Sequence, residues 1–141
     1  MEAVAIHLDV KLALIVDDSE LQREVLSRML KEEGYKVISA NDGLDGVTKY
    51  IKYQPDLVLM DINMPEMNGL QLMEKIQQID KELPIILVTG HGDISMAVSA
   101  IRSGAYDFIE KPFSNEQITD VVRRALEKRA LTLENRNLRK E

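Results

Sequence analysis

The chain has 141 residues, of which 45% are apolar, and this length and composition suit one compact domain with a single core and a short appendage. Its 24 acidic residues exceed its 18 lysines and arginines, and the formal charge of −6 argues against direct contact between this domain and nucleic acid. The absence of cysteine excludes a disulfide framework and a thiolate metal site.

Short apolar runs alternate along the chain with longer segments whose apolar residues recur at helical spacing. This alternation is typical of an α/β fold, a doubly wound parallel sheet with helices on both faces. We predict five strands, at Leu12–Val16, Lys36–Ser39, Leu57–Met60, Ile85–Thr89 and Tyr106–Ile109.

Helices are predicted in the gaps between these strands. The first follows Ser19 as N-cap and stops at Gly34, the second ends before Pro55, the third starts near Gly69, and the fourth ends near Gly104. Their apolar stripes are interpreted as core, and these comprise Leu21, Val25, Leu26, Met29, Leu30, Leu44, Val47, Tyr50, Ile51, Leu72, Met73, Ile76, Ile79, Ile94, Ala97, Val98 and Ile101.

A fifth helix is predicted from near Ser114 to the last residue, because neither Pro nor Gly interrupts this segment. It is longer than one sheet face requires. We therefore divide the chain into an N-terminal extension at 1–10, a domain at 11–128, and the end of the long helix at 129–141. Four basic residues on this helix are interpreted as a solvated face: Arg123, Arg124, Lys128 and Arg129.

The end of the long helix also carries a coiled-coil spacing. Leu126, Ala130, Leu133 and Asn137 follow alternating steps of four and three, which favours pairing in a homodimer. Leu131 and Leu138 offer a competing seam, and a single helix with a solvated end remains the alternative.

Nothing in the sequence indicates a membrane partner. No stretch is apolar for long enough to span a bilayer, and the first nine residues carry acidic side chains in place of the basic-then-apolar layout of a signal peptide. We expect a cytoplasmic protein.

Polar side chains suited to catalysis or metal binding follow the predicted strands. Asp17 and Asp18 come after the first strand, Asp61 after the third, Thr89 at the end of the fourth, and Lys111 after the fifth. Parallel strands bring their carboxyl ends to one sheet edge, where ligands bind at the switch point in strand order. Each aspartate alone is more typical of a turn or helix cap than of a reactive site, and it is the coincidence of five groups that favours chemistry.

Three crowded carboxylates raise one another's pKa unless a cation neutralises them, and Mg²⁺ suits such an oxygen-rich site. With an ammonium and a hydroxyl beside them, the groups suit a transferring phosphoryl group. In such a site one aspartate can serve as nucleophile and form an acyl phosphate.

Four motifs then become recognisable as a set: Val16-Asp17-Asp18, Leu59-Met60-Asp61-Ile62-Asn63-Met64-Pro65 with Gly69, Thr89-Gly90, and Glu110-Lys111-Pro112-Phe113. The chain resembles bacterial response-regulator receiver domains over about residues 12–125. The resemblance implies a flavodoxin-like sheet of order 2-1-3-4-5, a two-component sensor histidine kinase as partner, and phosphorylation of Asp61.

The same resemblance implies roles for the neighbouring residues. Mg²⁺ would be held by Asp17, Asp18, Asp61 and the backbone carbonyl of Asn63. Thr89 and Lys111 would bind the phosphoryl oxygens, Phe108 would turn inward as a switch when Thr89 moves, and the Lys111–Pro112 peptide bond is a candidate cis bond.

Two further runs, at 88–93 and 104–113, resemble receivers of nitrogen-regulatory and dicarboxylate-transport regulators. That group activates sigma-54 RNA polymerase through an AAA+ ATPase domain and binds DNA through another. The resemblance implies that residues 129–141 lead towards such an output domain outside this chain. A receiver of a helix-turn-helix regulator and a stand-alone receiver remain open.

Two rivals come from other classes. A phosphatase of the haloacid dehalogenase type also presents an aspartate after an apolar strand, but it needs a second aspartate as general acid where this chain has Asn63. A flavodoxin-like flavin carrier would meet repulsion between the flavin phosphate and the acidic loop at 17–20. We therefore expect a signalling phosphoacceptor and not an enzyme with turnover.

Overall fold

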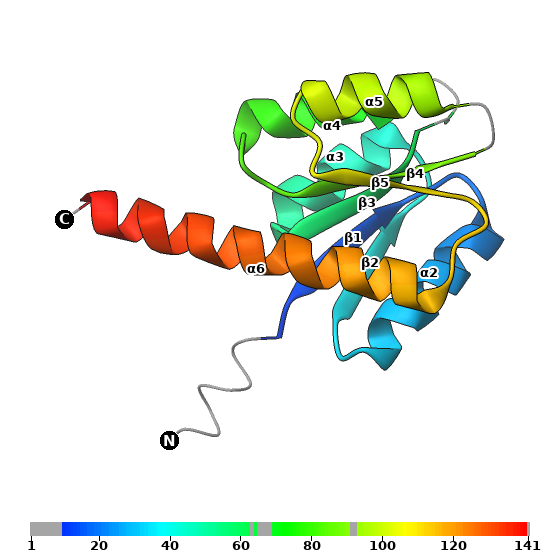
Figure 1. Ribbon diagram of the computed structural model, residues 1–141, viewed down its shortest axis with the longest axis horizontal. Helices are drawn as coiled ribbons and strands as arrows, with labels where there is room; N and C mark the ends of the chain where they lie inside the picture. The colour runs from blue at the N-terminus through cyan, green and yellow to red at the C-terminus, as the bar shows by residue number, and fades with distance from the viewer. Residues whose placement is uncertain (1–9, 63, 65–68, 91–92, 141) are drawn as a thin grey trace.

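The computed structural model describes residues 10–62, 64, 69–90 and 93–140, and the predicted N-terminal extension lies almost wholly outside them. Strands and helices alternate along the chain (Figure 1). Their bounds are β1 Leu12–Val16, α2 Glu20–Glu32, β2 Lys36–Ala40, α3 Gly43–Tyr53, β3 Leu57–Asp61, α4 Gly69–Ile79, β4 Ile85–Thr89, α5 Ile94–Arg102, β5 Asp107–Glu110 and α6 Asn115–Lys140.

The five strands form one sheet of order β2-β1-β3-β4-β5, and each neighbouring pair is parallel. The predicted doubly wound fold and its strand order are thus confirmed. Two predicted strands match to the residue, β2 and β3 are one residue longer than predicted, and β5 is shifted by one residue towards the C-terminus. β3 continues through Asp61 because this residue still pairs with Val88 of β4.

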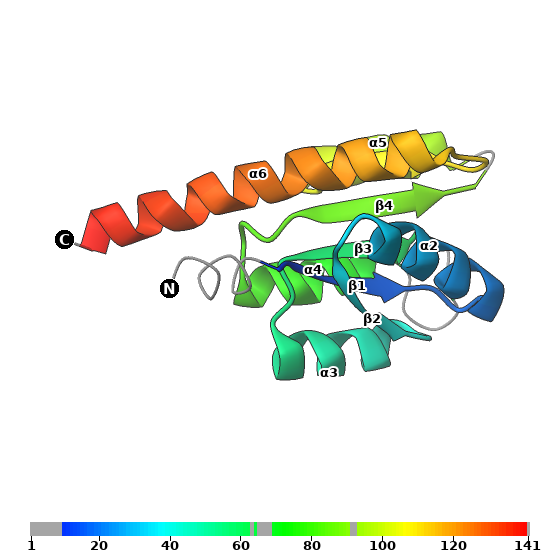
Figure 2. The same cartoon turned by 90° about the horizontal axis from the view of Figure 1, so that it is seen from below.

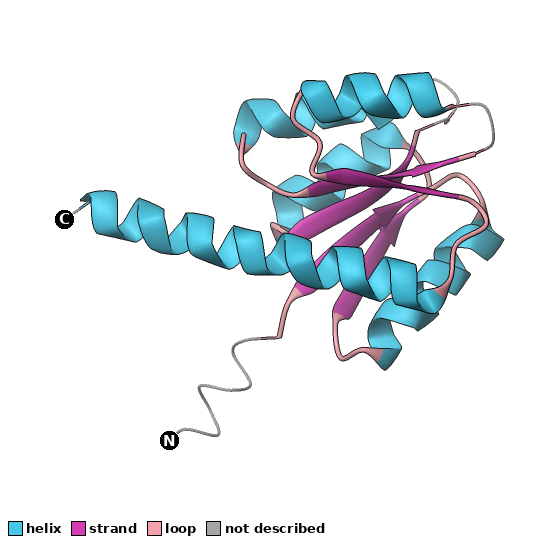
Figure 3. Ribbon diagram, in the orientation of Figure 1, coloured by secondary structure: helices cyan, strands magenta, loops and turns pink. Residues whose placement is uncertain are grey.

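Helices cover both faces of the sheet (Figure 3). One core cluster packs β-sheet residues such as Leu14 and Met60 against α3, α4 and α5, and the other packs Ile15 and Leu59 against α2 and α6. Figure 2 shows α3 and α6 on opposite sides of the sheet. Burial on both sides explains why β3 and β4 are continuous apolar runs and do not alternate.

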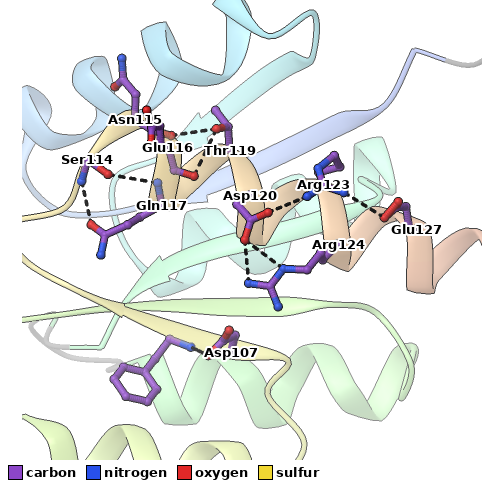
Figure 4. Close-up of polar contacts among 11 residues, drawn as sticks. Asp107, Ser114, Asn115, Glu116, Gln117, Thr119, Asp120, Arg123, Arg124 and Glu127 are labelled. Carbon is purple, nitrogen blue, oxygen red and sulfur yellow. Dashed lines mark hydrogen bonds and ion pairs between the residues drawn. The ribbon is translucent and has the colours of Figure 1, made fainter.

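The helix ends follow local chemistry. The Ser19 hydroxyl accepts a hydrogen bond from the backbone N–H of Gln22, which confirms Ser19 as the N-cap of α2. At the start of α6, the Ser114 hydroxyl accepts from Gln117 N–H while the Gln117 side chain accepts from Ser114 N–H (Figure 4). This reciprocal pair satisfies two backbone groups that the helix leaves without partners.

Part of the predicted core is wrong. Seven residues of the helical stripes lie at the surface, with exposed fractions from 36% to 70%: Leu21, Val25, Leu44, Ile51, Ile79, Ile94 and Val98. A helix lying on a sheet buries only a narrow stripe, as Leu26 and Leu30 do in α2, and apolar residues at its margin remain in water. Among the described residues, no helix is long and apolar enough to cross a membrane.

Candidate functional site

The strand register brings the polar residues of the sequence motifs to one edge of the sheet. Val16 pairs with Met60, so Asp17 follows at the level of Asp61. Asp61 pairs with Val88, one residue before Thr89, and Thr89 pairs with Glu110, one residue before Lys111. The backbone N–H of Lys111 donates to the Thr89 carbonyl at 2.8 Å, which ties the last two strand ends together.

Three carboxylates meet at this edge. Oxygen atoms of Asp17, Asp18 and Asp61 all lie within 4.8 Å of one another. Asp17 and Asp61 are buried, with exposed fractions of 1% and 8%, whereas Asp18 is exposed. The cluster therefore has two shielded charges and one side open to solvent.

The loop after β1 fixes the position of Asp17. Its Oδ1 accepts a hydrogen bond from the backbone N–H of Ser19 at 2.9 Å, and the Arg23 guanidinium donates to its backbone carbonyl at 2.7 Å. Its Oδ2 is buried and has no hydrogen-bond partner among the described residues. Such an atom is costly unless something else binds it.

Burial, which disfavours the charged carboxylate, is the main reason why the pKa of Asp17 is raised to about 6. The nearby charges of Asp61 and Asp18 add to the increase, while the Ser19 hydrogen bond and the charge of Lys111 oppose it. Perturbed carboxylates of this kind gather at functional sites.

Lys111 and Thr89 complete the edge. Lys111 Nζ lies 3.9 Å from Asp61 Oδ2, and the exposed fractions of the two side chains are 36% and 11%. The Thr89 residue is completely buried, and within the described chain its hydroxyl oxygen has no hydrogen-bond partner. The Lys111–Pro112 peptide bond is cis.

Gly69 holds the other side of Asp61. Its backbone N–H donates to the Ile62 carbonyl at 3.0 Å, which brings the start of α4 against the end of β3. A Cβ at this position would lie 2.8 Å from the Asp61 carbonyl oxygen and 2.9 Å from the Ile62 Cα. Only glycine fits there without a shift of the backbone that carries Asp61.

The residues present fit a divalent cation. Carboxylate oxygens are the ligands that Mg²⁺ prefers, the unpartnered Oδ2 of Asp17 is available to it, and three negative charges favour its binding. Asn63, whose carbonyl the sequence analysis added to this set, lies outside the described residues.

The remaining switch candidate, Phe108, is half-buried and packs against the core cluster beneath α3, α4 and α5. It is not part of the carboxylate cluster. The sequence analysis missed Arg23 and gave Gly69 no more than a place in a motif. The signal for Arg23 was its place four residues after the N-cap, on the first turn of α2, where a long side chain can reach back to the loop.

Comparison with known proteins gives a consistent picture. A family model described as the response regulator receiver domain matches residues 13–123. The C4-dicarboxylate transport transcriptional regulatory protein DctD of Pseudomonas aeruginosa is 46% identical over 126 residues, which cover 89% of this chain and 27% of that protein. The chain thus spans about a quarter of the length of such regulators.

Two further comparisons are with a protein of similar length and with a solved structure of a longer regulator. The chemotaxis protein CheY of Bacillus subtilis is 40% identical over 114 residues, which cover 80% of this chain and 95% of that protein. The crystal structure of NtrX from Brucella abortus in complex with ADP superposes with a TM-score of 0.88 at 38% identity, over 92% of this chain and 30% of that one.

Proposed function

The chain belongs to the family of response regulator receiver domains, and on that premise we propose that Asp61 accepts a phosphoryl group from the histidine of a sensor kinase. The observation that carries the proposal is the meeting of Asp17, Asp18 and Asp61 within 4.8 Å, with Lys111 Nζ 3.9 Å from Asp61. In this step a carboxylate oxygen of Asp61 bonds to phosphorus and the phosphorus–nitrogen bond breaks. The electron pair stays on the imidazole, which leaves as a neutral group because its other ring nitrogen carries a proton.

The product is an acyl phosphate on the protein itself. The imidazole leaves as a neutral group, so the transfer needs no general acid, and Asn63 stands where a phosphatase of the haloacid dehalogenase type has its acid. We therefore describe the chain as a signalling phosphoacceptor and not as an enzyme with turnover, apart from the formation and loss of its own phosphoryl group.

We propose Mg²⁺ as the cofactor, held by Asp17, Asp18, Asp61 and the backbone carbonyl of Asn63. When bound, it neutralises the negative charge of the phosphoryl oxygens and of the carboxylates. Arg23 and Ser19 hold the Asp17 loop in place before binding, so little rearrangement of this loop is required.

Lys111 and Thr89 contribute at the phosphoryl group. The Lys111 ammonium pairs with one phosphoryl oxygen, and the Thr89 hydroxyl, buried without a partner in the described chain, gains one when it donates to another. Movement of Thr89 leaves room for the half-buried Phe108 to turn inward. This couples phosphorylation to the face formed by α5, β5 and α6.

For the output we propose sigma-54-dependent activation of transcription. The likeness to DctD, of which this chain spans 27%, supports a receiver at 11–128 followed by a helix that leads at 129–141 towards an AAA+ ATPase and a DNA-binding domain. The receiver itself would make no contact with nucleic acid. A stand-alone receiver is the second candidate, because the match to CheY covers 95% of that protein.

We also propose a cytoplasmic homodimer that pairs through the end of α6. Leu126 packs inside the domain with an exposed fraction of 7%, so the seam starts beyond it, near Leu133. Leu131, with an exposed fraction of 62%, belongs to the competing seam.

Phosphorylation is tested with a small phosphodonor such as acetyl phosphate in the presence of Mg²⁺. The mass of the intact protein should increase by one phosphoryl group, and the increase should disappear on removal of Mg²⁺ and in Asp61→Asn. Asp56→Asn provides the matched control at an aspartate just before β3. Equal labelling of Asp61→Asn and the wild type would refute the assignment.

A further inference from the structure

A second charged cluster lies at the opposite edge of the sheet from Asp61. Asp80 occupies the turn between α4 and β4, and two arginines of α6 bind its carboxylate. Arg129 Nη2 lies 2.5 Å from Asp80 Oδ2, and Arg136 Nη2 lies 2.9 Å from Asp80 Oδ1. We call Asp80, Arg129 and Arg136 the latch.

The centre of the latch is shielded from water. The exposed fractions of the Asp80 and Arg129 side chains are 13% and 11%, whereas Arg136 is 33% exposed and also contacts Glu82 at 3.3 Å. Burial opposes ionisation of Asp80, but the hydrogen bonds from Arg129 and Arg136 outweigh it and hold its pKa below the ordinary value. The carboxylate is therefore charged, and screening by salt reaches this pair less than a surface pair.

The latch attaches the C-terminal part of α6, which lies beyond the hydrophobic core, to the rest of the domain. Residues from Ile118 to Leu126 pack against the sheet and α2. Beyond them α6 continues past the sheet to Lys140 (Figure 1). A helix end without partners is marginal in water, so the latch supplies charged contacts where apolar contacts are few.

The latch also determines which face of α6 lies against the domain. Arg129, Leu133 and Arg136 follow steps of four and three, so they share one face of the helix. Leu133 is half-buried between the two arginines, whereas Ala130, its neighbour in the predicted seam, and Leu131 are exposed. The covered face contains Leu133, the residue on which the proposed pairing seam depends.

We propose that the latch is autoinhibitory. It holds the distal half of α6 on its own domain, and it thereby prevents the Leu133 face from pairing with the α6 of a second copy. Opening the latch frees this face while the core contacts as far as Leu126 stay in place. The inference rests on the proposed pairing through α6 but not on the chemistry of Asp61, so labelling of Asp61 and the test of the latch can fail independently.

A purely local role for Asp80 is the alternative. Its Oδ1 also accepts a hydrogen bond from the backbone N–H of Glu82 at 3.1 Å. Its own backbone N–H donates to the Ile76 carbonyl at the end of α4. Asp80→Asn keeps the oxygen acceptor for the turn and removes the charge that both arginines bind. This substitution therefore separates a latch from a turn former.

The experiment compares hydrogen exchange and sedimentation of the full, unphosphorylated chain. The control is Arg124→Gln, which removes an ion pair with Asp120 on the exposed face of the same helix (Figure 4). In Asp80→Asn, amides at 129–136 should exchange roughly ten- to a hundredfold faster, the loss expected for a charged hydrogen bond, while β3 amides keep their protection. Sedimentation should show more dimer than in the wild type, and Arg124→Gln should change neither result.

Two outcomes would overturn the proposal. One is unchanged exchange at 129–136 in Asp80→Asn, and the other is faster exchange there with no increase in dimer. If Asp80→Asn does not fold, Arg136→Gln removes the more exposed of the two arginines that bind Asp80. Hydrogen exchange at 129–136 and the amount of dimer in this variant then test the proposal in the same way.

Discussion

Removing the negative charge of Asp17 should stabilise the protein when Mg²⁺ is absent. At neutral pH the folded chain holds this carboxylate ionised although burial raises its pKa to about 6. In the unfolded chain it ionises at its ordinary pKa of 3.8. The difference corresponds to about 3 kcal/mol, because each pKa unit is worth about 1.4 kcal/mol.

The sign of the pH dependence follows from proton binding. Between about pH 4 and 6 the folded state keeps a proton on Asp17 that the unfolded state has lost, so the free energy of unfolding decreases as pH rises through this window. In Asp17→Asn this decrease is absent. The variant keeps an oxygen for the Ser19 N–H and gains an amide that can donate to the neighbouring Asp61 carboxylate.

Urea unfolding in a chelating buffer at several pH values measures the effect. Asp17→Asn should exceed the wild type in free energy of unfolding by up to about 3 kcal/mol at pH 7.5, and the advantage should shrink towards pH 4. Asp18→Asn, on the same loop but exposed, is the control and should show a smaller gain. A variant that is less stable than the wild type at pH 7.5, or an advantage independent of pH, would refute the reasoning.

Three further predictions concern the same edge of the sheet. Mg²⁺ at a hundred times its dissociation constant should stabilise the wild type by about 2.7 kcal/mol and Asp18→Asn by clearly less, as urea unfolding can measure, and an equal response would count against the carboxylate cluster. Gly69→Ala should lose about 1–3 kcal/mol of stability and slow phosphorylation, although alanine is the better helix former, because its Cβ would meet the Asp61 carbonyl oxygen at 2.8 Å. Gly90→Ala, where the nearest atom is 3.5 Å from the added Cβ, should be tolerated, and equal losses in the two variants would contradict the steric argument. A phosphoryl mimic should shift backbone NMR signals at Ala97–Ala105 and Phe108, and shifts confined to the loops beside Asp61 would speak against transmission through Thr89.

The sequence predicted most of the fold because apolar runs of strand length are a strong signal in a sheet that is buried on both faces. It also brought Asp17, Asp61, Thr89 and Lys111 together, since parallel strands end at one edge whatever the details of packing. The depth of burial of Asp17 and its unpartnered oxygen depend on the surrounding loops, and no periodicity in the sequence encodes them.

Other features needed three-dimensional contacts. Leu21 and Val25 satisfy helical spacing but lie at the margin of the stripe, where packing and not periodicity decides exposure. Arg129 was interpreted as part of a solvated face, yet it is bound to Asp80, 49 residues earlier in the chain. A basic residue on a helix carries no local signal for a partner at such a distance, so sequence patterns did not indicate the latch.

The most direct test of the central claim is to locate the acyl phosphate by chemistry at the residue itself. After treatment with acetyl phosphate and Mg²⁺, borohydride reduces an aspartyl phosphate to homoserine, and mass spectrometry of peptides then identifies the converted position. The account predicts conversion at Asp61 alone, and none when Mg²⁺ is chelated. Homoserine at Asp17, Asp18 or another aspartate, with Asp61 unchanged, would contradict it.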